Sequence, residues 1–127
     1  MMGPHKNLRV WQLSMKFVSD IYLVTSHYPD TEKFGLVNQM RRAAVSIPSN
    51  IAEGYGRSSV SDLLHFMYFA LGSSNEIDTQ ILISKDLGFI NEEEFYSLDT
   101  QISDINKMLS SLIYKKKHEM SQPTVKP

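Results

Sequence analysis

The sequence predicts an all-α protein, an antiparallel up-down-up-down four-helix bundle whose second helix is kinked near Ala44 by Pro48. Apolar residues recur at spacings of three and four in four segments, and turn or capping signals separate these segments. No segment of useful length alternates with a period of two. A chain of 127 residues supports one hydrophobic core, so we expect one domain over residues 1–120 and a disordered tail over residues 121–127.

The first helix is expected from Leu8 to about Ser26. Its apolar stripe is wide enough to contact two neighbouring helices. The residues of this stripe are Val10, Trp11, Leu13, Phe17, Val18, Ile21, Tyr22, Val24 and Thr25. Pro29 then interrupts the helical pattern, and Thr31 is a candidate cap for the next helix.

The second helix is expected from about Glu32 to Gly56. Its apolar positions are Phe34, Val37, Met40, Ala44, Ile47, Ile51 and Tyr55. Pro48 lies inside this segment, where a proline removes one backbone hydrogen bond and clashes with the carbonyl four residues earlier. The stripe continues in phase beyond Pro48, which favours a kink. The alternative is two short helices that meet at residues 46–49.

The third helix is expected to begin at the S-x-x-D capping pattern of Ser59 and Asp62 and to end before Gly88. Its apolar positions are Leu63, Leu64, Phe66, Met67, Ala70, Leu71, Ile77, Ile81 and Leu82. The small residues at positions 72–74 favour close approach of another helix over a notch for a ligand.

Asn91 is the expected cap of the fourth helix, and the acids at 92–94 suit the positive end of its dipole. The helix carries a heptad seam made of Phe95, Leu98, Ile102, Ile105, Leu109 and Leu112. This pattern fades through residues 114–118.

Composition excludes several classes of function. The chain has no cysteine, which rules out disulfides, thiolate catalysis and Cys-ligated metals. No apolar run approaches the ~18 residues of a membrane span, so we expect no membrane partner and a cytoplasmic location. The net charge is -1, but residues 1–60 carry a net +3 and residues 61–127 a net -4. This balance argues against a wholly basic nucleic-acid-binding surface and leaves room for a local basic patch.

We expect no catalytic residue, no metal, no cofactor and no small-molecule substrate. Asp62-x-x-His65 is the nearest match to the Glu-x-x-His pairs of di-metal bundles, but it occurs once. Helical ribonucleases of the HEPN type place Arg and His about four to six residues apart for acid–base chemistry. Seven residues separate Arg57 from His65. The protein is therefore predicted not to be an enzyme, and the alternative is a helical RNA-processing enzyme that uses Arg57 and His65.

Cations form the candidate sites for RNA or for a protein partner. Arg41 and Arg42 are adjacent, so their side chains point about 100° apart on a helix. They are either a solvated pair, a phosphate contact or an intersubunit ion pair. The basic run at 115–117 serves either as a helix cap or as a nucleic-acid contact. The full set of candidates is Arg41, Arg42, Arg57, Lys115, Lys116 and Lys117.

Apolar surplus on the second and third helices predicts self-association, since these helices carry more large apolar residues than one core requires. The interface candidates are Tyr55, Phe66, Tyr68 and Phe69, and Tyr96 adds to the surplus.

A structural role is expected for a separate set of residues near the kink. Asn50 could bond a carbonyl that Pro48 leaves without its usual partner, and Glu53 is spaced to pair with Arg57.

Three segments carry a resemblance to a known family. They are Leu8-Arg9-Val10-Trp11-Gln12, the run from Arg41 to Gly54 that contains Pro48, Asn50 and Glu53, and Ala70-Leu71-Gly72-Ser73 with Glu76 and Gln80. In these segments the chain resembles the 23S rRNA intervening-sequence proteins over about residues 8–115.

The resemblance implies a four-helix bundle that assembles into a barrel-shaped homopentamer, with genes in some bacteria lying inside insertions of the large ribosomal RNA gene. A related protein, the accessory variability determinant of diversity-generating retroelements, is a strongly basic pentamer that binds nucleic acid and a reverse transcriptase. This chain departs from it in charge, at -1 overall. The expected function is a homo-oligomeric binding or scaffold protein associated with RNA, the ribosome or another protein, with Arg41, Arg42 and Arg57 as the candidate contacts.

Overall fold

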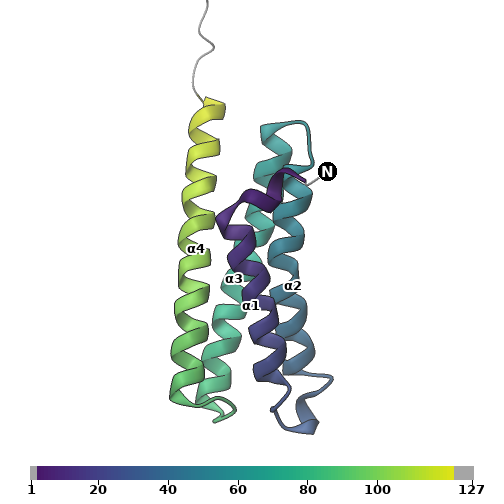
Figure 1. Cartoon of the computed structure of the whole chain (residues 1–127), viewed down its shortest axis with the longest axis vertical. Coiled ribbons are helices and arrows are strands. Elements are labelled where there is room, and N and C mark those ends of the chain that lie inside the picture. The colour runs from purple at the N-terminus through teal and green to yellow at the C-terminus, as the bar shows by residue number, and fades with distance from the viewer. Residues whose placement is uncertain (1–2, 122–127) are drawn as a thin grey trace, which may run out of the picture.

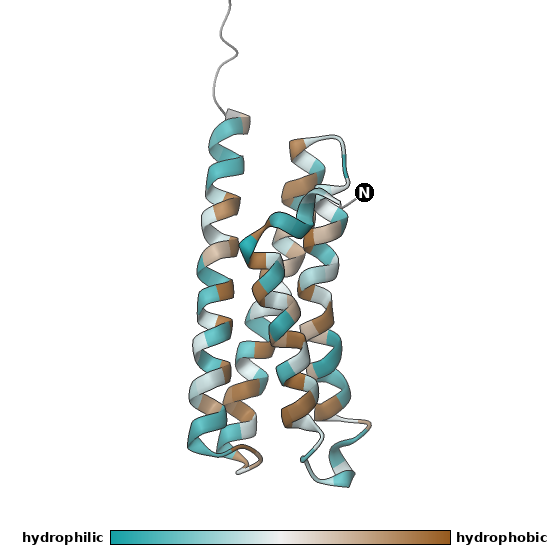
Figure 2. Ribbon diagram, viewed as in Figure 1, coloured by the Kyte–Doolittle hydropathy of each residue, from teal (hydrophilic) through white to brown (hydrophobic). Residues whose placement is uncertain are grey.

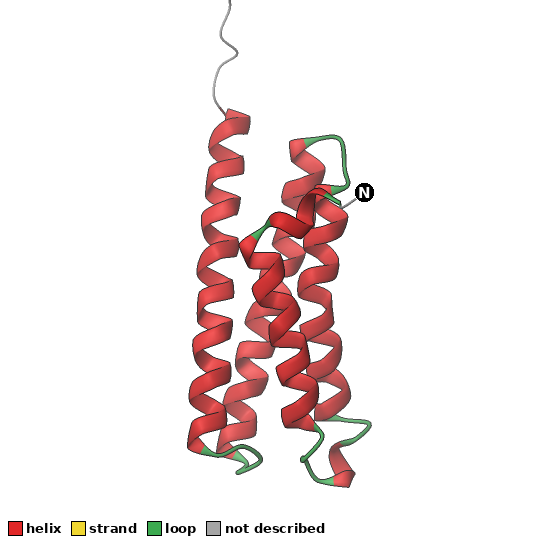
Figure 3. Ribbon diagram, viewed as in Figure 1, coloured by secondary structure: helices red, strands yellow, loops and turns green. Residues whose placement is uncertain are grey.

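The structure, a computed structural model, describes residues 3–121, which form four long helices, two short 3-10 turns and no strand (Figure 3). The elements are η1 (Pro4–Asn7), α1 (Arg9–Thr25), η2 (Asp30–Glu32), α2 (Leu36–Tyr55), α3 (Val60–Asp86) and α4 (Glu92–Ser121). Each helix packs against the next one along the chain, and α4 packs back on α1. In Figure 1, α1 and α3 run downward while α2 and α4 run upward.

The predicted four-helix bundle is confirmed. The two neighbours expected for the first helix are α2 and α4. The predicted tail lies outside the described residues, except for Ser121, which is the last residue of α4. None of the helices within residues 3–121 combines the length and the apolar character that crossing a bilayer requires.

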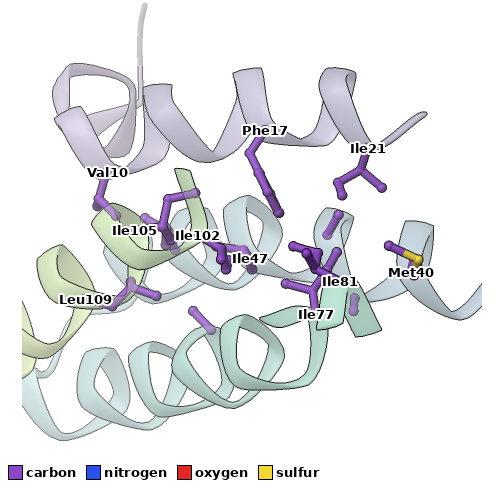
Figure 4. Packing of buried hydrophobic residues seen from close by; sticks show 14 of the residues in the cluster. Val10, Phe17, Ile21, Met40, Ile47, Ile77, Ile81, Ile102, Ile105 and Leu109 are labelled. Carbon is purple, nitrogen blue, oxygen red and sulfur yellow. The ribbon is translucent and has the colours of Figure 1, made fainter. Parts of the chain in front are cut away.

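The core lies along the bundle axis, where apolar stripes of all four helices meet (Figures 2 and 4). Full burial of one large apolar side chain contributes about 1.5–3 kcal/mol relative to leaving it exposed. The largest side chains with almost no exposed surface are Phe17, Ile21, Met40, Ile47, Ile51, Met67, Ile77, Ile81, Leu98, Ile102, Ile105 and Leu109. The periodic positions of the sequence therefore identify most of the core.

The start of α2 differs from its prediction. The helix begins at Leu36 and not near Glu32, because Gly35 has a ψ of -109° that is incompatible with a helix. Thr31 does not cap it. Instead, a carboxylate oxygen of Glu32 accepts a hydrogen bond from the Leu36 backbone N–H at 3.4 Å. Phe34, predicted on the buried stripe, lies in the turn before the helix and is 88% exposed.

The helix α2 is continuous through Pro48, so the alternative of two short helices is wrong. The amide of Asn50 donates to the carbonyl oxygen and the hydroxyl of Ser46, at 2.8 Å each. The proline leaves the carbonyl of Ala44 without its helical donor, so the predicted partner of Asn50 was the wrong carbonyl. The kink near Ala44 stays a prediction.

The caps of α3 and α4 agree with the sequence. The Ser59 hydroxyl accepts a hydrogen bond from the Asp62 backbone N–H at 3.1 Å. Gly88 lies two residues after the end of α3 and has a φ of +78°. Asn91 and Glu94 form a reciprocal capping box, because the side chain of each accepts from the backbone N–H of the other, at 2.8 and 2.9 Å.

The small residues in the middle of α3 have different surroundings. Gly72 is exposed, and a Cβ placed there would meet no atom within 4 Å. Ser73 and Ser74 make the contacts instead: the Ser73 hydroxyl donates to Ser46 of α2 at 2.8 Å, and Ser74 accepts from Asn106 of α4 at 3.2 Å. The contacts with neighbouring helices expected of segment 72–74 are therefore made by Ser73 and Ser74, whereas Gly72 takes no part in them.

Candidate interaction surfaces

The described residues contain no ready metal centre. Within residues 3–121, no group of three or more His, Cys, Asp or Glu side chains is placed to hold a metal ion. The ring of His65 lies on the surface against Phe69 and Phe66, with centroid distances of 4.6 and 5.9 Å.

The two adjacent arginines point to different places, as their spacing predicts. Arg41 is half-buried and joins α2 to the end of α1, donating to the Thr25 hydroxyl at 3.0 Å and to the Tyr22 carbonyl at 3.2 Å. Its guanidinium carbon also lies 4.4 Å from the centroid of the Tyr22 ring. These contacts give Arg41 a structural role, because they tie α2 to the last turn of α1, where the Tyr22 carbonyl also accepts from the backbone N–H of Ser26.

Arg42 is exposed and borders two shallow hollows. The first, of about 490 Å³, lies between α1 and α2 and includes Tyr22 and Val45. The second, of about 370 Å³, lies between α2 and α3 and includes Ser73 and Glu76. Arg42 is therefore the more accessible of the two arginines.

The other motif residues pack α2 against α3. A Cβ added to Gly54 would lie 3.1 Å from side-chain carbons of both Leu63 and Phe66 and 3.3 Å from the Leu63 carbonyl oxygen. Glycine therefore lets the two helices approach closely here. The predicted pair of Glu53 and Arg57 is present at 3.8 Å, but it is exposed and so contributes little to stability.

An apolar groove lies between α1 and α2. It has a volume of about 420 Å³ and is lined by His5, Trp11, Met15, Val18, Val45, Pro48, Ser49 and Ala52. Two of its apolar residues stay substantially exposed, Met15 at 44% and Val45 at 40%. Val45 also borders the hollow that contains Arg42, so apolar and basic surface are continuous.

The sequence contained a signal for this groove that was interpreted differently. Trp11 and Val18 widened the apolar stripe of the first helix, and the excess was assigned to contact with a second helix. The contact with α4 exists. Part of the excess nevertheless lines the open groove on the α2 side.

The predicted interface residues gather at one end of the bundle, where α2 stops, α3 starts and α4 stops (Figure 1). Tyr68 and Phe69 are 46% and 50% exposed, whereas Tyr55 and Phe66 are half-buried. Tyr96, which is 74% exposed, lies near the start of α4 at the opposite end.

Cations and histidines accompany the rings at this end. The guanidinium carbon of Arg57 lies 4.9 Å from the Phe66 centroid, and the Lys117 Nζ lies 5.9 Å from the Tyr68 centroid. His118 stacks on Tyr114 with an interplanar angle of 6° and a centroid separation of 6.2 Å. Two of the predicted cations, Arg57 and Lys117, therefore share one surface with the predicted interface rings Phe66 and Tyr68, although the sequence assigned them separate roles.

Tyr55 at the end of α2 is influenced by charges at the end of α4. Burial raises the pKa of the Tyr55 phenol, while Lys116 lowers this pKa and Glu119 raises it, both by their charges. Lys116 and Glu119 pair with each other at 3.4 Å. The side chain of Lys115, in contrast, makes no ion pair or hydrogen bond with any described residue.

Comparisons with known proteins agree with this fold. Residues 6–111 match the family described as 23S rRNA-intervening sequence protein. The chain is also similar to the crystal structure of a protein of unknown function from the S23 ribosomal protein family of Bacteroides thetaiotaomicron. The TM-score is 0.76 and the sequence identity 27%, over 82% of this chain and 97% of that one. No curated protein matches the chain significantly. The chain therefore belongs to the 23S rRNA-intervening sequence protein family.

Proposed function

We propose that this chain is a non-enzymatic assembly module that forms a homo-oligomer, a pentamer as the family resemblance implies, and associates with RNA or the ribosome. The observation that carries the proposal is the apolar groove between α1 and α2. Its exposed Met15 and Val45 continue the surface of half-buried Trp11 and Val18. Exposed apolar residues that are grouped in one place indicate an interaction site, whereas single scattered ones do not.

A second copy of the chain is a fitting occupant of this groove. The groove adjoins Arg42 in the basic half of the chain, and the acidic half presents exposed Glu92, Glu93 and Tyr96 at the start of α4. A contact between two different, complementary surfaces of identical subunits repeats from one subunit to the next and closes into a ring when the rotation fits. Opposite charge on the two halves therefore supports a cyclic assembly.

The association with RNA or the ribosome rests on family membership. The similar solved structure is described as a member of the S23 ribosomal protein family. The cations at the ends of α2 and α4 supply the positive charge that phosphate contact requires.

Light scattering on two matched variants of α1 tests the assembly. Met15→Glu places a charge in the groove, whereas Leu23→Glu places the same charge at a residue that is 66% exposed and does not line the groove. We expect wild type and Leu23→Glu to be oligomers and Met15→Glu to be a folded monomer. A monomeric wild-type protein at micromolar concentration would overturn the proposal.

A third variant tests the interface that the sequence predicted. Phe69→Ser removes one exposed ring of α3 and leaves the groove unchanged. We expect it to remain oligomeric. If Phe69→Ser dissociates and Met15→Glu does not, assembly uses the α3 rings and not the groove.

The alternative of an RNA-processing enzyme has one observation in its favour, because Arg57 and His65 both contact the ring of Phe66. Prolonged incubation of RNA with the protein, with and without divalent metal, separates the two functions. We expect the RNA to stay intact. Cleavage that is lost in His65→Gln would establish the enzyme instead.

A further inference from the structure

We infer that the end of the bundle formed by the α2–α3 turn and the last turns of α4 binds an unpaired nucleic-acid strand, which stacks its bases on exposed rings and places its phosphates on the neighbouring cations. This inference names the ligand for the RNA association proposed above and rests on it. We call the surface the ring–cation end, and its members are Arg57, Tyr68, Phe69, Tyr114, Lys115 and Lys117.

The rings of this surface keep exposed area beside their contacts with Lys117, His65 and His118. Tyr68, Phe69 and Tyr114 are 46%, 50% and 72% exposed, so none of them serves mainly as a core residue. They come from two helices, and the contact of Lys117 with Tyr68 brings the end of α4 next to the start of α3. Aromatic side chains beside a basic path are how proteins bind single strands with little sequence preference, since every base has a stacking face.

The charge of this end differs from that of the whole chain. Residues 57–69 and 114–118 contain Arg57 and the three lysines at 115–117, with Asp62 as the one acid. Glu53 and Glu119 flank the surface and pair with Arg57 and Lys116. Lys115 and Lys117 make no such pair with a described residue, so they remain for phosphates.

The position of the cations also fits a single strand. Lys117 lies over the ring of Tyr68, and Arg57 lies over the ring of Phe66 beside Phe69. A base stacked on an exposed ring then has a cation within reach of its phosphate. The predicted arginines of α2 are less available for phosphate. Arg41 also lies over an exposed ring, that of Tyr22, but its guanidinium is engaged by hydrogen bonds to α1, and Arg42 borders a hollow that contains the carboxylate of Glu76.

Fluorescence anisotropy with a labelled oligouridine strand tests the surface. Tyr114→Ala should weaken binding about tenfold, because one base–aromatic stack is lost. The matched control is Phe34→Ala, which removes a ring that is 88% exposed in the turn before α2, at the opposite end of the bundle, and should bind as wild type does. Lys117→Gln should reduce the salt dependence of log Kd by about 0.7, the contribution of one phosphate contact, and exposed Lys107→Gln should not.

Binding of other nucleic acids shows whether the surface prefers unpaired strands. A single-stranded DNA of matched length should bind comparably, since stacking does not require the 2′-hydroxyl, and a duplex should bind more weakly. Stronger binding of the duplex would overturn the inference. Circular dichroism and light scattering on each variant establish that fold and assembly are retained.

The possible failures are distinguishable. If Tyr114→Ala and Lys117→Gln both bind as wild type and Arg42→Gln does not, RNA association stands and the inferred surface is wrong. If the wild type binds no strand while remaining oligomeric, the surface and the RNA association both fail and the assembly stands.

Discussion

Arg41 and Arg42 show how strongly the role of a charged residue depends on its position around a helix. Both belong to the same turn of α2, but only Arg41 reaches the carbonyl and the ring of Tyr22 at the end of α1. A planar guanidinium can donate hydrogen bonds and stack at the same time, which a lysine cannot reproduce. The arginine at position 41 thus fixes the packing of two helices, and the one at position 42 remains at the surface.

Tyr28 is a buried residue whose hydroxyl makes no hydrogen bond with a described residue. Burial raises the pKa of its phenol above the ordinary value of 10.0; the charge of Glu94 raises it further, and an interaction with Ser84 partly offsets these effects. The Ser84 hydroxyl itself donates to the Gln80 carbonyl at 2.8 Å. The folded state therefore favours the neutral phenol more strongly than the unfolded state does.

Replacing Tyr28 by Phe should change how the free energy of unfolding decreases at alkaline pH. Because the pKa of the Tyr28 phenol is raised in the folded state, this phenol adds to the free energy of unfolding below about pH 10. This stabilisation is lost as the pH rises through the folded pKa. The free energy of unfolding of Tyr28→Phe should thus fall less in alkali than that of wild type. At neutral pH the variant should gain about 1 kcal/mol, since a buried unpaired hydroxyl is removed.

Urea unfolding at neutral pH and above pH 10 measures both effects. Tyr96→Phe, at a ring that is 74% exposed, is the control and should behave as wild type. A loss of stability in Tyr28→Phe at neutral pH would show that the hydroxyl has a hydrogen-bond partner in solution.

At the scale of the helices, periodicity and capping residues were sufficient to predict most of the structure. The seam of α4 is buried at Leu98, Ile102, Ile105 and Leu109 as its spacing indicates. The start of α2 was less predictable. The backbone N–H of Leu36 donates to the carboxylate of Glu32 and not to the hydroxyl of the nearby Thr31. Several turn conformations fit such a local sequence, and the packing of neighbouring elements selects one of them.

Two glycines offer a test of how closely α2 and α3 pack. Gly72→Ala should raise the free energy of unfolding by about 0.5–1 kcal/mol, because alanine favours the helix and nothing obstructs its methyl group. Gly54→Ala should lower it by about 1–3 kcal/mol, because its methyl group would press on Leu63 and Phe66 of α3. Thermal or urea unfolding measures both. Stabilisation by both substitutions would mean that the helices separate easily at Gly54.

At the scale of the whole molecule, the candidate surfaces depend on residues that are distant in sequence. Tyr68 meets Lys117 only because α3 and α4 are neighbours, and Trp11 shares a groove with Val45 only because α1 and α2 are. From sequence, the cations and the rings were recognised separately and given different roles. Residue types indicate which chemistry is present, whereas the packing of helices decides which residues act together.

If the chain assembles through its apolar groove, folding and association are linked, so stability must depend on protein concentration. For a pentamer that dissociates as it unfolds, a hundredfold rise in concentration adds about 2 kcal/mol of stability per subunit. For a chain of 127 residues this raises the melting temperature by about 5–10 °C. Calorimetry across this range measures the shift.

The groove variant separates this linkage from other effects of concentration. Met15→Glu should melt at one temperature at every concentration, because the charge prevents association while the core is untouched, whereas Leu23→Glu should retain the wild-type dependence. A wild-type melting temperature that does not change with concentration would show that the four helices are stable as a single subunit and that the groove serves another partner.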